Sequence, residues 1–304
     1  MKKADFTATV IDNVRVTDRF YRLYLLLDAV GSEVFSDCVP GQFAEFKVSD
    51  LAMPPVENID ENMRDDASDS IILRRPFSFS DIRKTDAGVE MDVLYGVVGA
   101  GTIRMTTMKK GDKIGVIGPL GNGFKIPADK TTALLIGGGT GTPPIQHLSK
   151  YLKRKYPQIK TTVFVGARSK NDLPVILAEN NEGQDSISEF AEFSVEHYIA
   201  SDDGSIGFKG VVTEAVEEYI RKNKPDADET IIFACGPAPM LKAAAKLAGQ
   251  YDIDSQLSTE RMMACGIGLC QSCAVETKSN TNDDTEYKLC CKDGPVFNGK
   301  KLKF

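Results

Sequence analysis

The sequence predicts a multidomain β plus α/β protein with an antiparallel β-barrel, a parallel α/β domain and a small C-terminal module. Short apolar stretches separated by turns fill the chain to about residue 124, and from about residue 130 strands alternate with helices. Five of the seven cysteines lie between residues 265 and 291. We expect boundaries at 1–128, 129–250 and 251–304, since 304 residues are enough for two or three separate cores.

The barrel is predicted from the density of strands and turns in the first domain. Pro40-Gly41, Gly111-Asp112 and Gly118-Pro119 interrupt the chain between apolar stretches. Many short strands at this spacing are typical of a closed or nearly closed antiparallel barrel, with one helix expected at 102–109. Residues 57–69 carry six acids against one arginine and predict a solvated loop. The strands expected are 7–11, 20–27, 42–48, 71–73, 90–97 and 113–117.

The second domain begins with a βαβ unit. A buried strand at 131–136 runs into a cluster of glycines, a helix at 145–156 and a further strand at 161–165. Repetition of this pattern predicts an open parallel sheet with helices on its faces. The later elements expected are strands at 193–199 and 230–234 and helices at 212–223 and 238–251.

Charge and hydropathy exclude two classes of partner. Lys and Arg number 37 against 43 Asp and Glu, which gives a net charge of -6 and a pI near 5.2. An acidic chain offers no overall positive field for a nucleic acid backbone. No apolar stretch approaches the roughly 18 residues of a membrane-spanning helix, and no secretory segment is evident. We therefore expect a cytoplasmic protein that binds neither nucleic acid nor membrane.

The cysteine cluster gives the most specific signal in the sequence. Cys265, Cys270 and Cys273 follow the spacing C-x4-C-x2-C, which is typical of plant-type [2Fe-2S] sites. Three thiolates from one loop must converge on two irons, and glycines between them let the backbone wrap closely. A fourth sulfur follows at Cys290 or Cys291, and the spacing alone does not choose between them.

Structural zinc is the alternative for this cluster. Such sites usually combine C-x2-C with a second C-x2-C or with histidines. The chain has one C-x2-C, and both of its histidines, His147 and His197, lie in the α/β segment. The spacing therefore favours the iron–sulfur interpretation.

A glycine-rich turn follows the first strand of the α/β domain. Gly138, Gly139, Thr140 and Gly141 lie between this strand and the next helix, where free backbone amides can bind a pyrophosphate. The turn departs from the full dinucleotide fingerprint, because Pro144 occupies the place of the third glycine and no acid ends the next strand. Alone, the motif is a weak predictor of a dinucleotide site.

Two further motifs have chemistry that suits cofactors. Arg75, Pro76, Phe77 and Ser78 combine a guanidinium, a stiffened turn and a hydroxyl, which fits a flavin phosphate and ring edge as well as an ordinary surface ion pair. Ala234 precedes Cys235, Gly236 and Pro237 at the end of a late strand, where ligands of parallel sheets bind. A buried core thiol is the simpler interpretation of Cys235.

Taken in order along the chain, these motifs resemble the ferredoxin-NADP reductase superfamily. The stretch from Glu260 to Cys273 and the run Cys291-Lys292-Asp293-Gly294-Pro295-Val296-Phe297 narrow the resemblance. They are similar to the electron transfer subunits of NAD-dependent (class 1B) dihydroorotate dehydrogenases. The resemblance covers nearly the whole chain, and its cysteine motifs are its most specific parts.

The resemblance implies the cofactors and their residues. It implies Cys291 as the fourth ligand of the [2Fe-2S] cluster, and a nucleotide site completed by the turn at 202–205. NAD is expected at Gly138, Gly139, Thr140, Gly141, Cys235, Gly236 and Pro237. FAD is expected at Arg75, Pro76, Phe77, Ser78, Tyr95, Val97, Gly101 and Thr102.

It also implies a function without catalytic acids or bases of its own. The chain would relay electrons between NAD and an FMN-containing catalytic dihydroorotate dehydrogenase subunit, in a heterotetramer that serves pyrimidine biosynthesis. A related cytosolic subunit that serves ferredoxin, sulfide or polysulfide, or a hydrogenase is the alternative within redox chemistry. A zinc-stabilised interaction protein is the alternative outside it. The choice between NAD and NADP, and the direction of transfer, stay open at this point.

Overall fold

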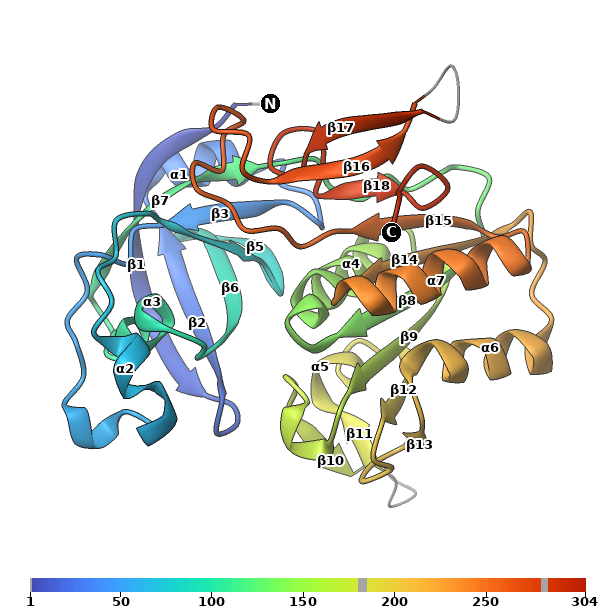
Figure 1. Ribbon diagram of the computed structural model, residues 1–304, viewed down its shortest axis with the longest axis horizontal. Helices are drawn as coiled ribbons and strands as arrows, with labels where there is room; N and C mark the ends of the chain where they lie inside the picture. The colour runs from blue at the N-terminus through green and yellow to red at the C-terminus, as the bar shows by residue number, and fades with distance from the viewer. Residues whose placement is uncertain (1, 180–184, 280–283) are drawn as a thin grey trace.

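The computed structural model describes residues 2–179, 185–279 and 284–304. It contains an antiparallel sheet on one side, a mainly parallel sheet with helices on the other, and a C-terminal segment that lies across both (Figure 1). This arrangement confirms the predicted fold class. No helix among the described residues is long and apolar enough to cross a membrane.

The first sheet has seven strands in the order β4-β3-β7-β1-β2-β6-β5. Alternate residues of its strands, such as Leu23, Leu25 and Leu27, point into a shared core, as period-2 patterning requires. The sheet curls around this core into an incomplete barrel (Figure 1). Its elements are β1 Ala4–Arg15, β2 Phe20–Leu27, α1 Ala29–Phe35, β3 Phe43–Phe46, β4 Arg75–Ser78, β5 Asp81–Thr85, β6 Gly88–Gly96, α3 Ala100–Met105 and β7 Lys113–Leu120.

Three local predictions in the barrel were wrong. Residues 71–73 are not a strand, because Ile72 and Leu73 point into solvent, and the strand is instead β4. The helix predicted at 102–109 is α3, which begins and ends earlier. The acidic segment 57–69 is not a plain loop: its acids are exposed, but Ile59 and Ala67 pack on α3. It folds into η1 Val56–Asn58, η2 Glu61–Met63 and α2 Arg64–Ala67.

The second sheet has the strand order β13-β12-β9-β8-β14-β15-β18. The central strand β8 is buried on both faces, since Ala133 and Leu135 pack under α4 while Leu134 and Ile136 pack under α6 and α7. The parallel ladder and its crossover helices agree with the prediction, and α6 has the predicted bounds. The elements are β8 Thr132–Gly138, η3 Gly139–Gly141, α4 Thr142–Lys155, β9 Lys160–Ala167, η4 Lys170–Asp172, β10 Leu177–Glu179, β11 Asp185–Ile187, α5 Ser188–Ala191, β12 Glu196–Ser201, β13 Phe208–Lys209, α6 Val212–Asn223, β14 Thr230–Cys235 and α7 Ala238–Gln250.

The C-terminal segment joins the two sheets. Its strands β15 Asp254–Ser258 and β18 Val296–Asn298 extend the parallel sheet, which the sequence did not predict. The hairpin of β16 Ala274–Lys278 and β17 Thr285–Leu289 lies at the top of the molecule (Figure 1). Cys273 and Val275 share one core with Phe43 and Leu120 of the barrel. The cysteines are therefore held at the junction of the barrel and the second sheet.

Candidate functional site

The Arg-Pro-Phe-Ser motif forms β4, an edge strand of the barrel sheet. The Arg75 guanidinium donates from Nη1 to the carbonyl oxygens of Leu73 at 2.9 Å and Arg74 at 3.3 Å, which fixes its direction. Its stem lies over Gly101 in α3, where an added Cβ would be 3.3 Å from Arg75 Cγ. The predicted flavin residues on β4 and α3 are thus brought together, with guanidinium N–H groups left for a phosphate.

The turn that leads into α3 is held by one hydroxyl. Thr102 Oγ1 accepts hydrogen bonds from the backbone N–H of Val98 at 2.9 Å and Gly99 at 3.2 Å, and donates to the Gly99 carbonyl at 3.0 Å. A Cβ at Gly99 would have no neighbour within 4 Å, so the backbone there faces open space. This turn beside Arg75 can accommodate a pyrophosphate.

Tyr95 is a buried support and not an exposed hydroxyl. Its ring stacks on Tyr21 at a centroid distance of 5.7 Å and meets the edge of Phe77 at 6.3 Å. Its hydroxyl donates to Asn13 Oδ1 at 3.2 Å, and burial raises the pKa of the phenol above its ordinary value. Tyr95 therefore joins β6 through Phe77 to β4, the strand that carries the predicted flavin motif.

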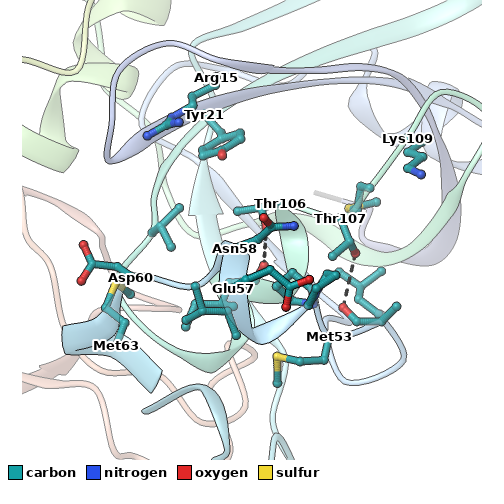
Figure 2. Close-up of a pocket in the computed structure, with 18 of the residues that line it drawn as sticks. Arg15, Tyr21, Met53, Glu57, Asn58, Asp60, Met63, Thr106, Thr107 and Lys109 are labelled. Carbon is teal, nitrogen blue, oxygen red and sulfur yellow. Dashed lines mark hydrogen bonds between the residues drawn. The ribbon is translucent and has the colours of Figure 1, made fainter. Parts of the chain in front are cut away.

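A hollow of about 1730 Å³ lies beside α3 (Figure 2). The close-up shows Arg15 of β1 and Tyr21 of β2 on one side, and Glu57 and Asp60 of the acidic segment 57–69 on the other. Thr107, just after α3, donates to the carbonyl of Ala52 at 3.3 Å, in the stretch of chain that precedes the acidic segment. Of the predicted cofactor residues, Val97 lines this hollow.

The glycine-rich turn of the second sheet packs directly against the Cys-Gly-Pro turn. Gly137 in β8 is the register partner of Cys235 in β14. A Cβ at Gly141 would lie 2.2 Å from the Cys235 carbonyl oxygen, so no side chain fits there. The two predicted nucleotide segments therefore meet at the carboxyl edge of the sheet, where parallel α/β sheets bind ligands.

The exposed side of the same turn is open. Gly139 adopts a φ of +51°, and a Cβ there would meet nothing within 4 Å. Thr142 Oγ1, in the first turn of α4, is buried with no hydrogen-bond partner among the described residues. The hydroxyl is covered by the turn, and it is the open backbone around Gly139, before the N-terminus of α4, that suits a phosphate group.

The turn at 202–205 lies at the same edge, after β12. Asp203 Oδ1 accepts hydrogen bonds from the Ser205 N–H at 2.9 Å and hydroxyl at 2.7 Å, which lower the pKa of that carboxyl. The Asp203 N–H donates to the Arg168 carbonyl at 3.1 Å. Hydrogen bonds thus connect Arg168, Asp203 and Ser205 at the same edge of the sheet as the glycine-rich turn at 138–141, here called the dinucleotide turn.

The Cys235 thiol lies inside the sheet core. It is 3% exposed, and burial raises the pKa of the thiol well above its usual range. Gly236 is buried as well and has a φ of +157°, whereas Pro237 is exposed. The thiol is therefore a packing group.

Four cysteines approach one another around the loop formed by residues 265–273, here called the cysteine loop. Leu269 and Cys270 both direct their backbone N–H groups at Cys265 Sγ, each at 3.4 Å. The loop turns through positive φ at Gly266, Gly268 and Gln271. Hydrogen bonds from Ser272 lower the pKa of the Cys270 thiol to about 6. Amide-to-sulfur bonds of this kind favour thiolates and tune iron–sulfur sites.

Cys290 and Cys291 point in different directions. Cys291 donates its backbone N–H to Cys273 Sγ at 3.4 Å, and burial and the Cys273 thiol raise the Cys291 pKa to about 12. The Cys290 thiol instead donates to the Thr259 carbonyl at 3.3 Å and is buried in the sheet core. The ligand assignment of Cys291 stays a prediction, and the packing favours it over Cys290.

The four cysteines form two neighbouring pairs, Cys265 with Cys270 and Cys273 with Cys291. Within the described ranges, no group of three or more His, Cys, Asp or Glu side chains is arranged to hold a single metal ion. The histidines of a zinc site are absent from this region. His147 lies on α4, and both ring nitrogens of His197 are engaged with Ile187 and Val195. Two pairs suit a two-iron group better than a single zinc ion.

The cysteine loop packs against β3, next to the strand β4 that carries the predicted flavin motif. A Cβ at Gly266 would lie 2.5 Å from Glu45 Oε1, and Glu45 is the register partner of Pro76 in β4. Glu45 is 1% exposed, and neither carboxylate oxygen has a hydrogen-bond partner among the described residues. Burial raises the pKa of this carboxyl to about 7, against the lowering effect of Arg74 and Arg75.

Two sets of contacts were missed by the sequence reasoning. Thr140 Oγ1 donates to Glu260 Oε1 at 3.3 Å, which links the dinucleotide turn to the segment that enters the cysteine loop. Arg22 makes buried contacts with Gln146 and Glu189 of the second domain. No spacing in the sequence marks these contacts, because their members lie more than 100 residues apart.

Comparisons with known proteins agree with this layout. A family model described as the iron–sulfur cluster binding domain of dihydroorotate dehydrogenase B matches residues 260–303. A second, described as an oxidoreductase NAD-binding domain, matches residues 135–246. The two matches fall on the cysteine segment and on the sheet that carries the dinucleotide turn.

Relatives and solved structures extend the match over the whole chain. The dihydroorotate dehydrogenase B (NAD(+)) electron transfer subunit of Fusobacterium nucleatum is 34% identical over 291 residues, 95% of each chain. That of Bacillus velezensis is 34% identical over 304 residues, 99% of each chain. A solved NADH-dependent reduced ferredoxin-NADP oxidoreductase is 26% identical and aligns with a TM-score of 0.70, over 97% of this chain and 89% of that one.

A ferredoxin reductase of carbazole 1,9a-dioxygenase is 18% identical and aligns with a TM-score of 0.60, over 83% of this chain and 67% of that one, and so shows the shared fold. Identity above 30% over nearly the full length of both chains goes further than fold. The chain belongs to the family of dihydroorotate dehydrogenase B (NAD(+)) electron transfer subunits.

Proposed function

We propose that this chain is the oxidoreductase subunit that relays electrons between a catalytic dihydroorotate dehydrogenase subunit and NAD, in pyrimidine biosynthesis. The relatives carry this activity in their names, and both matched family models are redox domains. The three parts of the chain, 1–128, 129–250 and 251–304, would bind FAD, NAD and a [2Fe-2S] cluster in turn. The setting is the cytoplasm.

One observation carries the proposal: the cysteine loop packs on β3, directly beside the strand with the flavin motif. The cysteines that would hold a cluster therefore lie against the strand next to the one that would hold the flavin. On the other side, the contact between Thr140 and Glu260 links the cysteine segment to the dinucleotide turn. The three sites therefore form one continuous assembly.

Each site residue has a holding role. Arg75 and the amides near Gly101 and Thr102 bind the flavin phosphates, while Pro76, Phe77, Ser78, Tyr95 and Val97 shape the ring site. Gly138, Gly139, Thr140 and Gly141 bind the dinucleotide beside Cys235, Gly236 and Pro237. Cys265, Cys270, Cys273 and Cys291 hold the cluster.

The chemistry of the relay belongs to the cofactors. When bound, a flavin exchanges electrons singly or in pairs, which joins a two-electron nicotinamide to a one-electron cluster. The chain orients these groups, excludes water from Tyr95 and the sheet core, and supplies amide N–H groups to the Cys265 and Cys273 sulfurs. No side chain of the described site is placed as an acid or base for an organic substrate, which a partner subunit would convert.

The partner is a catalytic subunit that contains FMN, and we propose that two copies of each chain form a heterotetramer. Apolar side chains in and just before the cysteine loop point into solvent: Leu269 is 76% exposed, and Met262, which precedes the loop, is 90% exposed. Cys270, which directly follows Leu269, is exposed as well. Large exposed apolar side chains beside a redox group favour docking of another protein at this loop.

The test is the substitution Cys270→Ser in protein purified anaerobically together with its partner. We expect iron and acid-labile sulfide to fall to background and coupled oxidation of dihydroorotate by NAD to stop. Reduction of the bound flavin by NADH should continue, because the flavin and dinucleotide sites are untouched. The control is Ser272→Ala, which removes a hydroxyl from the loop but no sulfur. Coupled turnover that survives in the Cys270→Ser protein would contradict the relay, as would native protein without iron or flavin.

A further inference from the structure

Six charged side chains, five of them buried, lie where the barrel meets α4 and α5 of the second domain. Three are cations and three are anions, so the group is neutral overall. Five of the six side chains are at most 7% exposed, and the sixth, Arg154, is 37% exposed. We call this group the interdomain charge network: Arg22, Asp81, Asp92, Lys150, Arg154 and Glu189.

Arg22 of β2 is the centre of one half of the network. Its Nη2 donates to Glu189 Oε1 of α5 at 2.9 Å and to Gln146 Oε1 of α4 at 3.2 Å. Its Nε lies 3.5 Å from Asp92 Oδ1 of the neighbouring strand β6. One guanidinium thus joins two barrel strands to two helices of the other domain.

Asp81 of β5 is the centre of the other half. Arg154 of α4 donates to its two oxygens at 2.8 and 2.9 Å, in a bidentate pair, and Lys150 Nζ lies 3.7 Å away. Asp81 is the register partner of Asp92, so the two halves are adjacent on the sheet. Both halves cross between the domains.

Buried ion pairs add little net stability to a contact between two domains. Removing an ion pair from water costs several kcal/mol per ion, and apolar side chains of equal size often stabilise such a contact as well or better. Apolar contacts, however, tolerate sliding, whereas paired charges and a bidentate fork fix one relative position. The network therefore contributes orientation more than stability.

The network is attached to both cofactor segments. Arg22 directly follows Tyr21, which stacks on Tyr95 of the flavin site. On the other side, Gln146 lies in the first half of α4, the helix that begins at the dinucleotide turn. Displacement of α4 relative to β2 would therefore shift the dinucleotide turn relative to the flavin strands.

We propose that Arg22 is a positioning residue for hydride transfer between the nicotinamide and the flavin, acting through Gln146 and Glu189. This inference rests on the proposed function. The step moves one hydride, which is one proton with two electrons, from NADH to the flavin and leaves NAD+. In this role Arg22 contacts neither cofactor. It sets the distance between the dinucleotide turn and the flavin strands.

The experiment measures reduction of the bound flavin by NADH in the holoprotein under anaerobic rapid mixing. The variants are Arg22→Lys and the double variant Arg22→Met with Glu189→Gln, which removes one charge of each sign. We expect the limiting rate to fall about tenfold or more in the double variant, because an ångström of misplacement can cost up to about a hundredfold. The NADH concentration at half-maximal rate should change little, since both binding turns are intact. Arg22→Lys keeps the charge without the fork and should give an intermediate rate.

The matched control is Lys130→Met. Lys130 is also buried, and it pairs with Asp254 of β15 at 3.0 Å, away from the contact between the barrel and α4. This substitution should lower the melting temperature without lowering the limiting rate. A double variant that retains its flavin and reduces it at the native rate would overturn the positioning role. Native protein whose flavin accepts no hydride from NADH would instead overturn the proposed function.

Discussion

The cysteine loop and the interdomain charge network are opposite kinds of site. Three cysteines of the loop lie between residues 265 and 273, and the loop leaves Cys270 and Leu269 exposed. The network gathers side chains from residue 22 to residue 189 and buries nearly all of them. The loop is built by local backbone conformation, while the network exists only when two domains are packed. Substitutions of cysteines in the loop should remove the cluster completely, whereas substitutions in the network should lower the rate of flavin reduction by degrees.

The largest effect that separates the two kinds of site is expected at Cys291. Substitution by Ser should remove the cluster, because Cys291 lies against Cys273, whereas Cys290→Ser should keep it, because the Cys290 thiol points to Thr259. Iron and sulfide content, with the electron paramagnetic resonance signal of reduced protein, distinguish the two variants. A cluster that survives in Cys291→Ser but not in Cys290→Ser would reassign the fourth ligand.

The same contrast explains what the sequence could predict. Cysteine spacing and the glycine-rich turn are local patterns, and helix α6 was predicted with its observed bounds because its apolar period is clear. Strands β15 and β18 were missed, since they are short and join the sheet only through partners far along the chain. Arg22 in the sequence is one arginine within an apolar strand, and nothing near it identifies Gln146 or Glu189.

The strand at 71–73 failed for a related reason. Its apolar residues suggested a buried strand, but Ile72 is 89% exposed and the ladder begins at Arg75. An apolar side chain shows strand-like composition whether or not it is buried. Local patterns therefore located the cofactor motifs better than the elements around them.

A smaller effect is expected at the dinucleotide turn, which combines local glycines with a distant contact. Gly141→Ala would place a methyl group 2.2 Å from the Cys235 carbonyl oxygen and must push the two turns apart. We expect the KM for NADH to rise by about tenfold, with a loss of stability of about 1–3 kcal/mol from overpacking. Steady-state kinetics with an artificial electron acceptor and thermal unfolding measure both.

The control for this substitution is Gly249→Ala, in α7, where an added Cβ meets nothing within 4 Å. Alanine in a helix is favoured over glycine by about 1 kcal/mol, so this variant should be slightly stabilised with an unchanged KM. An unchanged KM in Gly141→Ala as well would show that the contact between the two turns does not shape the nucleotide site.

The smallest effect on cofactor binding and turnover is expected where the cysteine loop rests on the barrel, at Glu45, because substitution there changes mainly the pH dependence of stability. Its carboxyl has a pKa of about 7 in the folded protein because of burial, against an ordinary value of 4.5. Between these pH values the folded state binds a proton that the unfolded state releases, so stability decreases as pH rises from 4.5 to 7. The full loss amounts to roughly 3 kcal/mol. Glu45→Gln removes this loss, because the amide stays neutral.

Thermal unfolding of native and Glu45→Gln protein across this pH range measures the difference. The two should be similar near pH 4.5, and the variant should be the more stable above pH 7. Glu33→Gln is the matched control: Glu33 pairs with Lys2 at 3.2 Å with both side chains mostly exposed, and such pairs contribute little at any pH. If Glu45→Gln were less stable than the native protein above pH 7, the carboxylate would have to be ionised and paired, and the cysteine loop would rest on an ion pair instead of a neutral acid.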